Sequence, residues 1–214
     1  MKVTIIGTGN VGGALGSSLV KAGHAVTLVG RDASKTQEVA SRIGAGAAGS
    51  AAAAAASADV VVLAVPYGAL DQVAGEIADA VAGKVVIDAV NPLKPDYSGL
   101  ATVGTSSAER LATILPGAKV AKAFNTLFAG VDADPRALGT TLDALFATDD
   151  ADARAAVAAL AASIGFRPVH VGPLAAAREL EAMAWLNIRL QMVSNGAWTT
   201  SYVLVGAPEA AIAA

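Results

Sequence analysis

The chain has no cysteine among its 214 residues, so disulfide bonds and thiolate-ligated metal sites are excluded. It is also poor in charge, because Asp, Glu, Lys and Arg make up only 15% of the sequence and the formal net charge is −3. A surface with so little positive charge gives no attractive field for nucleic acids or anionic membranes. We therefore expect neither as a partner, and we predict no metal site.

Groups that move protons near neutral pH are scarce as well, since only two histidines occur, His24 and His170. His24 precedes a predicted strand, on the side of the sheet away from a ligand, whereas His170 lies near a strand end and could reach one. Lys122 lies within a predicted strand, where burial of its stem is favoured over a role as a base. Alcohol dehydrogenases need a general acid or base, so we assign no catalytic residue and favour hydride exchange between two redox cofactors.

Long apolar runs are missing too. The apolar fraction of 54% is raised by alanine, and neither the alanine-rich residues 44–58 nor the polar-interrupted region after Ala182 resembles a membrane span. The apolar run after Met1 ends at Gly7, which is too short for a secretion signal. We expect a cytoplasmic protein with one large domain, or one domain and a small appendage.

A glycine-rich turn directly follows the apolar residues 3–6. It consists of Gly7, Thr8, Gly9, Asn10, Val11 and Gly12. In dinucleotide-binding proteins the first glycine of such a turn makes the tight bend, the second lets the backbone approach a pyrophosphate, and the third lets the helix pack on the strand. The spacing of Val11, Leu15 and Leu19 predicts the helix that this motif requires.

The end of the second predicted strand, residues 25–29, distinguishes NAD from NADP. NAD-selective sites hold the ribose 2′-hydroxyl with a carboxylate at this position, which is Gly30 here, and Arg31 follows. The Arg31 guanidinium can bind a 2′-phosphate bidentately, and Lys35 can add a second positive charge. We predict NADP; in the alternative, Arg31 and Lys35 are solvated while Asp32 binds the ribose of NAD.

Apolar runs rich in β-formers alternate with helical segments along the whole chain, which predicts an α/β fold of the Rossmann type, doubly wound around a mainly parallel sheet. We predict strands over residues 3–6, 25–29, 60–65, 84–87, 119–123, 142–147 and 167–171, with a short one at 45–48. We predict further helices over residues 34–43, 51–56, 69–81, 106–115 and 150–164, with Asp150 or Asp149 as the N-cap of the last. Residues 1–172 would form the NADP-binding domain and residues 173–214 a C-terminal helical segment.

In such a sheet the ligand lies outside the carboxyl ends of the strands, so the residues that follow three strands are candidates. Pro66 and Tyr67 follow one strand, and the rigid proline could present an apolar surface to a nicotinamide ring. Asn91 follows another, and its amide could bind a ribose hydroxyl or a carboxamide. Asn125 adds a second amide. Each could also be an ordinary turn residue, but together they would line one cleft.

These residues resemble the NADP oxidoreductases that depend on the deazaflavin coenzyme F420, and also their relatives, the cytosolic reductase domains of the STEAP metalloreductases. The resemblance covers nearly the whole chain. It rests on the glycine turn and on Gly30-Arg31 with Lys35, Ala64-Val65-Pro66, Asn91-Pro92, Lys122-Ala123-Phe124-Asn125, and Gly172-Pro173-Leu174 with Arg178 and Glu181.

The resemblance implies that the glycine turn and Arg31 bind NADPH and that the turns at Pro66 and Asn91 lie beside the nicotinamide. It also implies a homodimer, with a second redox cofactor as co-substrate. The F420 enzymes usually carry a serine in place of Gly30 and a histidine-containing turn in place of residues 124–126. Residues 124–126 are closer to the metalloreductase domains, which use flavin. The second cofactor is thus F420 or a flavin, FMN or FAD.

The tail from Leu174 to Tyr202 predicts an apolar helix that either covers the cleft or packs on a second copy. Our leading hypothesis is an NADPH-dependent oxidoreductase that exchanges a hydride with a deazaflavin or flavin. One alternative is a non-catalytic NADP-binding sensor or partner protein. Another is a small NADPH-dependent imine or ketone reductase, although enzymes of that kind use a long second helical domain for which this chain has too few residues.

Overall fold

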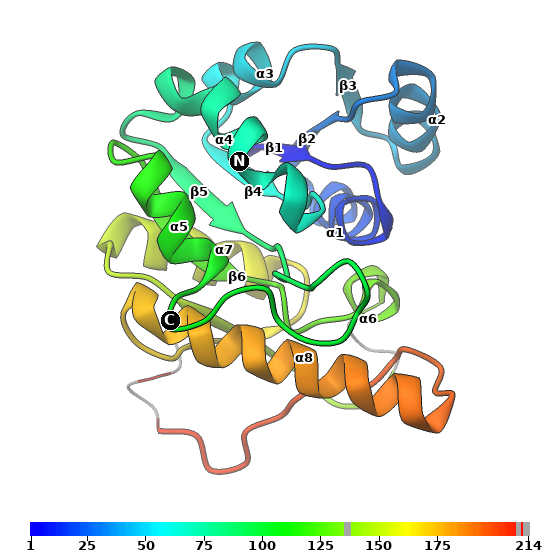
Figure 1. Ribbon diagram of the computed structural model, residues 1–214. Coiled ribbons are helices and arrows are strands. Elements are labelled where there is room, and N and C mark those ends of the chain that lie inside the picture. Colours follow the sequence, from blue (N-terminus) through cyan, green and yellow to red (C-terminus); the bar gives the residue numbers. More distant parts are fainter. Residues whose placement is uncertain (135–137, 209–210, 212–214) are drawn as a thin grey trace.

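The computed structural model describes residues 1–134, 138–208 and 211. At its centre lies an eight-stranded sheet with the order β3-β2-β1-β4-β5-β6-β7-β8 (Figure 1). Neighbouring strands are parallel except β6 and β7, which pair antiparallel. The strands are β1 (Lys2–Ile6), β2 (Ala25–Val29), β3 (Gly46–Ala48), β4 (Val60–Leu63), β5 (Val85–Asp88), β6 (Lys119–Ala123), β7 (Asp143–Ala147) and β8 (Arg167–His170).

Helices connect most of these strands. Within the described residues they are α1 (Asn10–Lys21), α2 (Ala33–Ile43), α3 (Ala51–Ser57), α4 (Leu70–Ile77), α5 (Ser107–Ile114), α6 (Ala129–Ala133), α7 (Ala151–Ser163) and α8 (Ala177–Ser194). Short 3₁₀ turns are η1 (Tyr67–Ala69), η2 (Ala78–Val81) and η3 (Leu174–Ala176). None of these helices combines the length and the hydrophobicity that crossing a membrane requires.

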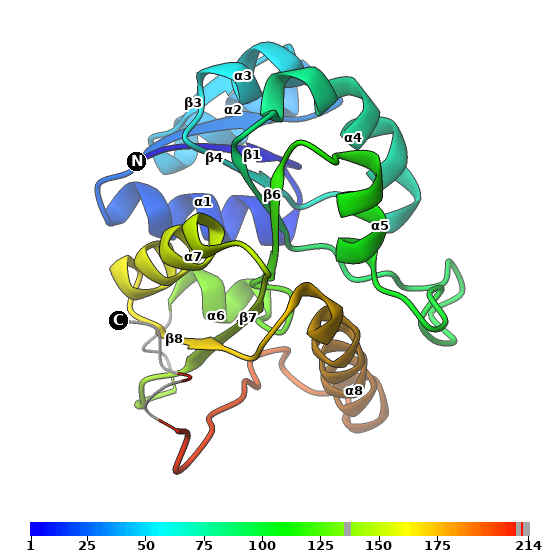
Figure 2. The ribbon, with the colours of Figure 1, turned by 90° about the vertical axis from the view of Figure 1, so that its left-hand side faces the viewer.

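The helices cover both faces of the sheet, and Figure 2 shows α1 and α7 on one side and α4 and α5 on the other. Successive strand residues point to opposite faces, so Ile5 packs under α1 while Ile6 belongs to the cluster that includes α3, α4 and α5. Strands covered on both faces must be apolar throughout, and all four residues of β4 are buried. The doubly wound fold predicted from the sequence is confirmed.

The chain order reverses between β1 and β4. From β1 the chain proceeds through β2 to β3 on one side, and β4 then starts the second half on the other side of β1. In open α/β sheets the crevice outside the carboxyl ends of the strands at such a switch point is where ligands bind. The segments that follow β1 and β4 at this crevice are the glycine turn and residues 64–67.

Helix α8 packs against β7 and β8 at the far end of the sheet. Its Leu180 lies in a small apolar cluster with Leu145, Ala147 and Val169. The opposite face of α8 is exposed along much of its length, and Leu186 is 63% exposed. The helix expected over the tail from Leu174 to Tyr202 thus ends at Ser194, and its outer face is not covered by the described part of one chain.

The predicted elements agree with the structure in place and type, with small corrections. The strand predicted over 60–65 ends at Leu63, because the Ala64 carbonyl turns toward Gly7. The helix predicted over 69–81 is regular only over Leu70–Ile77 and has 3₁₀ turns at both ends. Asp150 is the N-cap of α7 as predicted, since its Oδ1 accepts the Ala153 N–H at 2.9 Å.

Candidate active site

The glycine turn between β1 and α1 has a distinct structural reason for each glycine. Gly7 has a φ of 122°, and a Cβ there would overlap the carbonyl oxygen of Ala64. A Cβ on Gly12 would overlap the carbonyl oxygen of Gly7. Gly9 instead has nothing within 4 Å of its Cβ position. The first and third glycines thus allow close packing, while the second leaves open space for a ligand.

The N-terminus of α1 opens into that space. Gly9 is its N-cap, no side chain caps the helix, and no acidic residue lies in its first turn. The first N–H groups of such a helix lack partners within the helix, and its dipole favours a negative charge beside them. This end of α1 therefore suits an anion such as a pyrophosphate.

A cavity of about 760 Å³, which we call the α1 cavity, adjoins this helix end. Thr8, Gly9 and Asn10 line one side of it, and Lys35 and Arg42 belong to the α2 side. Asp32 also lines it, but Asp32 Oδ1 caps α2 by accepting the Lys35 N–H at 2.9 Å. Arg31 is exposed and is not among the residues that line the cavity. Its guanidinium is thus free to turn toward a ligand there.

Gly30, at the end of β2, is crowded by two threonine side chains. A Cβ at this position would lie 2.5 Å from Thr36 Oγ1 and 2.8 Å from Thr8 Oγ1. Thr36 is fixed because its hydroxyl donates to the Asp32 carbonyl at 2.7 Å. The hydroxyls of Thr8 and Thr36 thus fill the space into which a side chain at position 30 would project.

The turn after β4 lies against the glycine turn, since the Ala64 N–H donates to the Ile6 carbonyl at 2.9 Å. Val65 and Tyr67 are half-buried and Pro66 is exposed. None of these residues is among those that line the α1 cavity or the second cavity described below. Neither of these two cavities therefore joins this turn to the asparagine turns.

The two asparagines do meet. Asn91 Nδ2 donates to the Asn125 carbonyl at 2.9 Å, and Asn125 Nδ2 donates to Asn91 Oδ1 at 3.0 Å. Asn125 Nδ2 also donates to the Leu180 carbonyl of α8 at 3.1 Å. These bonds fix the orientation of the Asn125 amide and leave its Oδ1 buried without a donor. A buried acceptor without a partner destabilises the free protein and favours a ligand that donates to it.

The asparagines belong to a second cavity of about 320 Å³, which we call the α8 cavity. It shares Asn10, Ala129 and Gly130 with the α1 cavity. None of the residues that line it is Asp, Glu, Lys, Arg or His. They are Asn10, Val11, Asn91, Leu93, Tyr97, Asn125, Thr126, Leu127, Phe128, Ala129, Gly130, Ala184, Asn187, Ile188 and Trp198.

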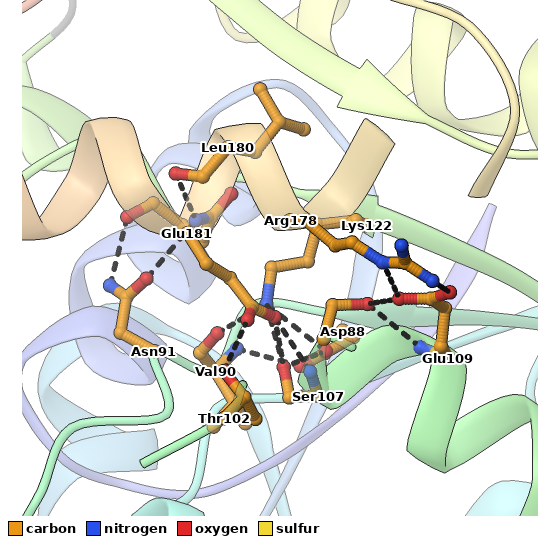
Figure 3. Close-up of polar contacts among 12 residues, drawn as sticks. Asp88, Val90, Asn91, Thr102, Ser107, Glu109, Lys122, Arg178, Leu180 and Glu181 are labelled. Carbon is orange, nitrogen blue, oxygen red and sulfur yellow. Dashed lines mark hydrogen bonds and ion pairs between the residues drawn. The ribbon is translucent and has the colours of Figure 1, made fainter. Parts of the chain in front are cut away.

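Beneath this cavity a buried ion network joins the sheet to α8 (Figure 3). The Lys122 ammonium on β6 donates to Glu181 Oε1 at 2.9 Å and to Asp88 Oδ2 at 3.1 Å. It also donates to Ser107 Oγ at 2.8 Å and to the Val90 carbonyl. Lys122, Asp88, Ser107 and Glu181 are all 0% exposed. Charges with no access to water are stable only when they are paired in this way.

The network fixes both asparagine turns. Asp88 Oδ1 accepts the Val90 N–H at 2.8 Å, directly before Asn91, while Glu181 follows Leu180, whose carbonyl binds Asn125. Glu181 also accepts the Ser107 N–H at 2.8 Å, which attaches α8 to the start of α5. The positions of the asparagines therefore depend on Lys122, although Lys122 does not line the cavity.

A half-exposed ion pair reinforces the contact between α5 and α8. Arg178 Nε donates to Glu109 Oε2 at 2.8 Å (Figure 3), and this guanidinium lowers the pKa of the Glu109 carboxyl. Sequence reasoning associated Arg178 and Glu181 only through the family resemblance. It missed Asp88 and Ser107, because nothing in their local sequence shows that β5 and α5 place them beside Lys122.

Neither histidine lies at the cavities. His24 contacts the N-terminal amine and Ser163. Its pKa is lowered mainly by partial burial and also by the charge of the nearby amine. His170 Nε2 lies 3.1 Å from the Thr148 carbonyl, and its ring packs on Phe146. No group of three or more possible metal ligands occurs within the described ranges.

Comparison with known proteins places this geometry in a family. Residues 2–92 match the model of the coenzyme F420-dependent NADP oxidoreductases. The F420-dependent NADP reductase of Methanothermobacter thermautotrophicus is 37% identical in an alignment that covers 90% of this chain and 90% of that protein. The chain belongs to the F420-dependent NADP reductase family. It is thus an NADP-dependent oxidoreductase.

Other relatives support this assignment. The rat metalloreductase STEAP3 is 32% identical over 85% of the chain, which spans only 36% of STEAP3. The crystal structure of a provisionally named F420-dependent NADP reductase from Arthrobacter sp. FB24 has a TM-score of 0.87 at 28% identity, covering 96% of this chain and all of that one. An imine reductase from Myxococcus stipitatus, at 18% identity and a TM-score of 0.70, shows a shared fold alone.

The buried network predicts the effect of removing its cation. In this reductase, Lys122→Met leaves two carboxylates buried without their ammonium, and the free energy of unfolding should fall by about 3–5 kcal/mol in urea titrations. The double variant Lys122→Met/Glu181→Gln restores the formal buried charge to that of the parent and should recover part of the loss.

Lys119→Met provides the matched control, since Lys119 lies on the same strand but pairs with Asp152 near the surface, with the two side chains 32% and 72% exposed. Its loss should cost at most about 1 kcal/mol. Equal costs for the two lysine variants would contradict a stabilising role of the buried ammonium.

Proposed function

We propose that this reductase transfers a hydride between NADP(H) and a second redox cofactor, either a deazaflavin of the coenzyme F420 type or a flavin such as FMN or FAD. The observation that carries the proposal is the pair of adjoining cavities. One lies at an uncapped helix N-terminus with lysine and arginine beside it, and the other is uncharged. They meet at Asn10, Ala129 and Gly130. Such a pair suits a phosphate-bearing donor and a conjugated acceptor in contact.

The α1 cavity would hold the adenosine and phosphate part of NADP(H). The turn from Gly7 through Gly9 to Gly12 would bring its backbone to the pyrophosphate, with Thr8, Asn10 and Val11 around it. Arg31 and Lys35 would bind the 2′-phosphate. The exposed Arg31 guanidinium can turn toward it, and Lys35 lines the cavity.

The asparagine pair would receive the nicotinamide end. The buried Asn125 Oδ1 lacks a donor, and a carboxamide NH₂ group would supply one. Asn91 and the neighbouring Pro92 would position the ribose side. We propose the turn formed by Ala64, Val65, Pro66 and Tyr67 as the apolar surface beside the ring, on the strength of the family resemblance.

The chemistry assigned to this site requires no protein acid or base. When bound there, NADPH would supply a hydride, which carries two electrons, and the acceptor would take one proton from water to complete its reduction. The residues of the chain orient the two rings and exclude water. The uncharged lining of the α8 cavity supports this division of labour. Since NADPH is an intracellular donor, we propose that the enzyme works in the cytoplasm.

The direct test mixes the protein with NADPH and one acceptor at a time, from coenzyme F420, FMN, FAD and riboflavin, while the nicotinamide absorbance is followed by stopped flow. At least one acceptor should be reduced with loss of the NADPH signal. Tight NADPH binding without reduction of any acceptor would instead identify a non-catalytic NADP-binding protein.

Arg31→Ser tests the phosphate assignment. Charge-assisted bonds contribute about 1.5–3 kcal/mol each, so the affinity for NADPH should fall by about ten- to a hundredfold while that for NADH changes little. Calorimetric titration measures both. Lys21→Ser is the control, because it also removes one positive charge but at the C-terminal end of α1, away from the glycine turn. It should leave both affinities unchanged. An equal loss for NADPH and NADH in Arg31→Ser would count against the assignment.

We further propose that residues 173–214 complete the acceptor cavity and that a second copy covers the outer face of α8. Leu186, Leu190 and Val193 share that face at spacings of four and three residues and are 63%, 51% and 79% exposed. So much apolar surface on one helix indicates an interface.

Analytical ultracentrifugation should give the mass of two chains for the parent and of one chain for Leu186→Arg/Val193→Arg. Val103→Arg changes a side chain that is 92% exposed on a loop outside α8 and should remain dimeric. A monomeric parent at micromolar concentration would refute the homodimer.

A further inference from the structure

Two large aromatic side chains stand exposed at the α8 cavity and have no part in the NADP(H) site proposed above. Tyr97 lines the cavity from the segment after β5, and Trp198 lines it from the segment after α8. Their exposed fractions are 57% and 45%. Aromatic rings are large apolar surfaces, so two of them left in water at one cavity indicate a ligand that covers them.

The backbone at both residues is strained. Tyr97 has a φ of 55° and Trp198 a φ of 57°, in the left-handed region that bulky side chains rarely adopt. The other non-glycine residues with positive φ within the described ranges are Phe124, directly before Asn125, and Asn195, directly after α8. All four lie in segments that line or lead into this cavity. Strain persists where surrounding contacts hold a residue in a place that function requires.

The segment that carries Trp198 is held firmly on α8. The Trp198 N–H donates to Gln191 Oε1 at 3.0 Å, and Gln191 Nε2 donates to Thr200 Oγ1 at 2.8 Å. Asn187 Nδ2 donates to the Thr200 carbonyl at 3.2 Å. The Trp198 ring also meets Phe128 edge to face, with centroids 5.3 Å apart. Its exposure therefore does not come from a loose segment.

Tyr97 is fixed by a turn of its own. Its N–H donates to the Lys94 carbonyl at 2.9 Å, and Leu93 and Leu100 pair across the base of this turn. Two rings on hydrogen-bonded turns, both lining the same uncharged cavity, can contact a flat ligand without rearrangement of their backbones.

We infer that Tyr97 and Trp198 form an aromatic clamp that binds the uncharged conjugated ring of the hydride-exchanging co-substrate. The inference rests on the proposed function and names residues that select its substrate class. An uncharged lining favours the ring, whereas phosphate or carboxylate groups on the same molecule would stay in water outside the cavity. Aromatic partners stack on a conjugated ring with an attraction beyond simple burial.

Glycine substitutions separate the rings from the backbone strain. Glycine adopts positive φ readily, so Tyr97→Gly and Trp198→Gly remove a ring without adding strain. Each variant should raise the KM for the acceptor that NADPH reduces about tenfold, the equivalent of about 1.4 kcal/mol. The Kd for NADPH should stay within about twofold, and the melting temperature of the Tyr97→Gly protein should not fall.

Two further variants serve as controls. Trp198→Phe keeps an aromatic ring and should retain most of the acceptor affinity. Trp185→Leu removes the other of the two tryptophans, which lies on α8, packs on Arg189 and does not line the cavity. Its KM values should match those of the parent.

Binding can be followed without turnover. In Trp185→Phe, Trp198 is the sole tryptophan, so riboflavin added to the NADP⁺-saturated protein should quench its fluorescence to saturation. Adding Tyr97→Gly should weaken that binding about tenfold. Undiminished riboflavin binding in the Tyr97→Gly variant, together with an unchanged KM for the acceptor in both glycine variants, overturns the clamp while hydride exchange stands. If the parent chain neither binds nor reduces coenzyme F420, FMN, FAD or riboflavin, the proposed function and the clamp are both overturned.

Discussion

The burial of one ammonium group between two carboxylates determines how the active-site region is assembled. Lys122 has no access to water and depends on Asp88, Ser107, Val90 and Glu181 for its partners. These partners come from β5, the segment after it, α5 and α8. Because an unpaired buried charge is costly, these elements must come together at the same point. The geometry of the neighbouring α8 cavity follows from that requirement, because the network positions the asparagine turns that line it.

The network also explains how an uncharged cavity can have well-defined polar groups. The charges lie beneath it and act through the backbone, by holding Val90 and Leu180 on either side of the asparagine pair. Asn91 and Asn125 then bind each other in a single arrangement. A cavity built in this way presents oriented amides to a ligand without placing ionisable groups next to the reacting atoms.

Most of the fold could be predicted from patterns of neighbouring residues. The glycine turn, the alternating strands and helices and the Asp150 cap all have signals within a few residues, and all are present in the structure. The antiparallel pairing of β7 had no such signal, since an apolar run such as Asp143–Ala147 reads the same in either direction. Helix α6 was missed because five residues are too few to show a helical period.

The site was harder to predict, because contacts between residues far apart in the chain also leave no local signal. Arg31 and the asparagine turns could be named because they directly follow strands, but Asp88, Ser107 and Glu181 acquire their roles only through contacts across 19 to 74 positions. The Trp198 segment was read as apolar tail, and its return to the cavity depends on Gln191 and Asn187, whose amides look like ordinary polar residues on a helix.

The crowding around Gly30 has a consequence for how coenzyme preference can change over evolution or by engineering. The customary route to NADH use introduces an acidic side chain at the end of the second strand. Here such a substitution requires the side chains of Thr8 and Thr36 to shift, because they occupy the volume that the first atom of the new side chain would need. A change of coenzyme at this position therefore involves both threonines as well, and one of them belongs to the phosphate turn itself.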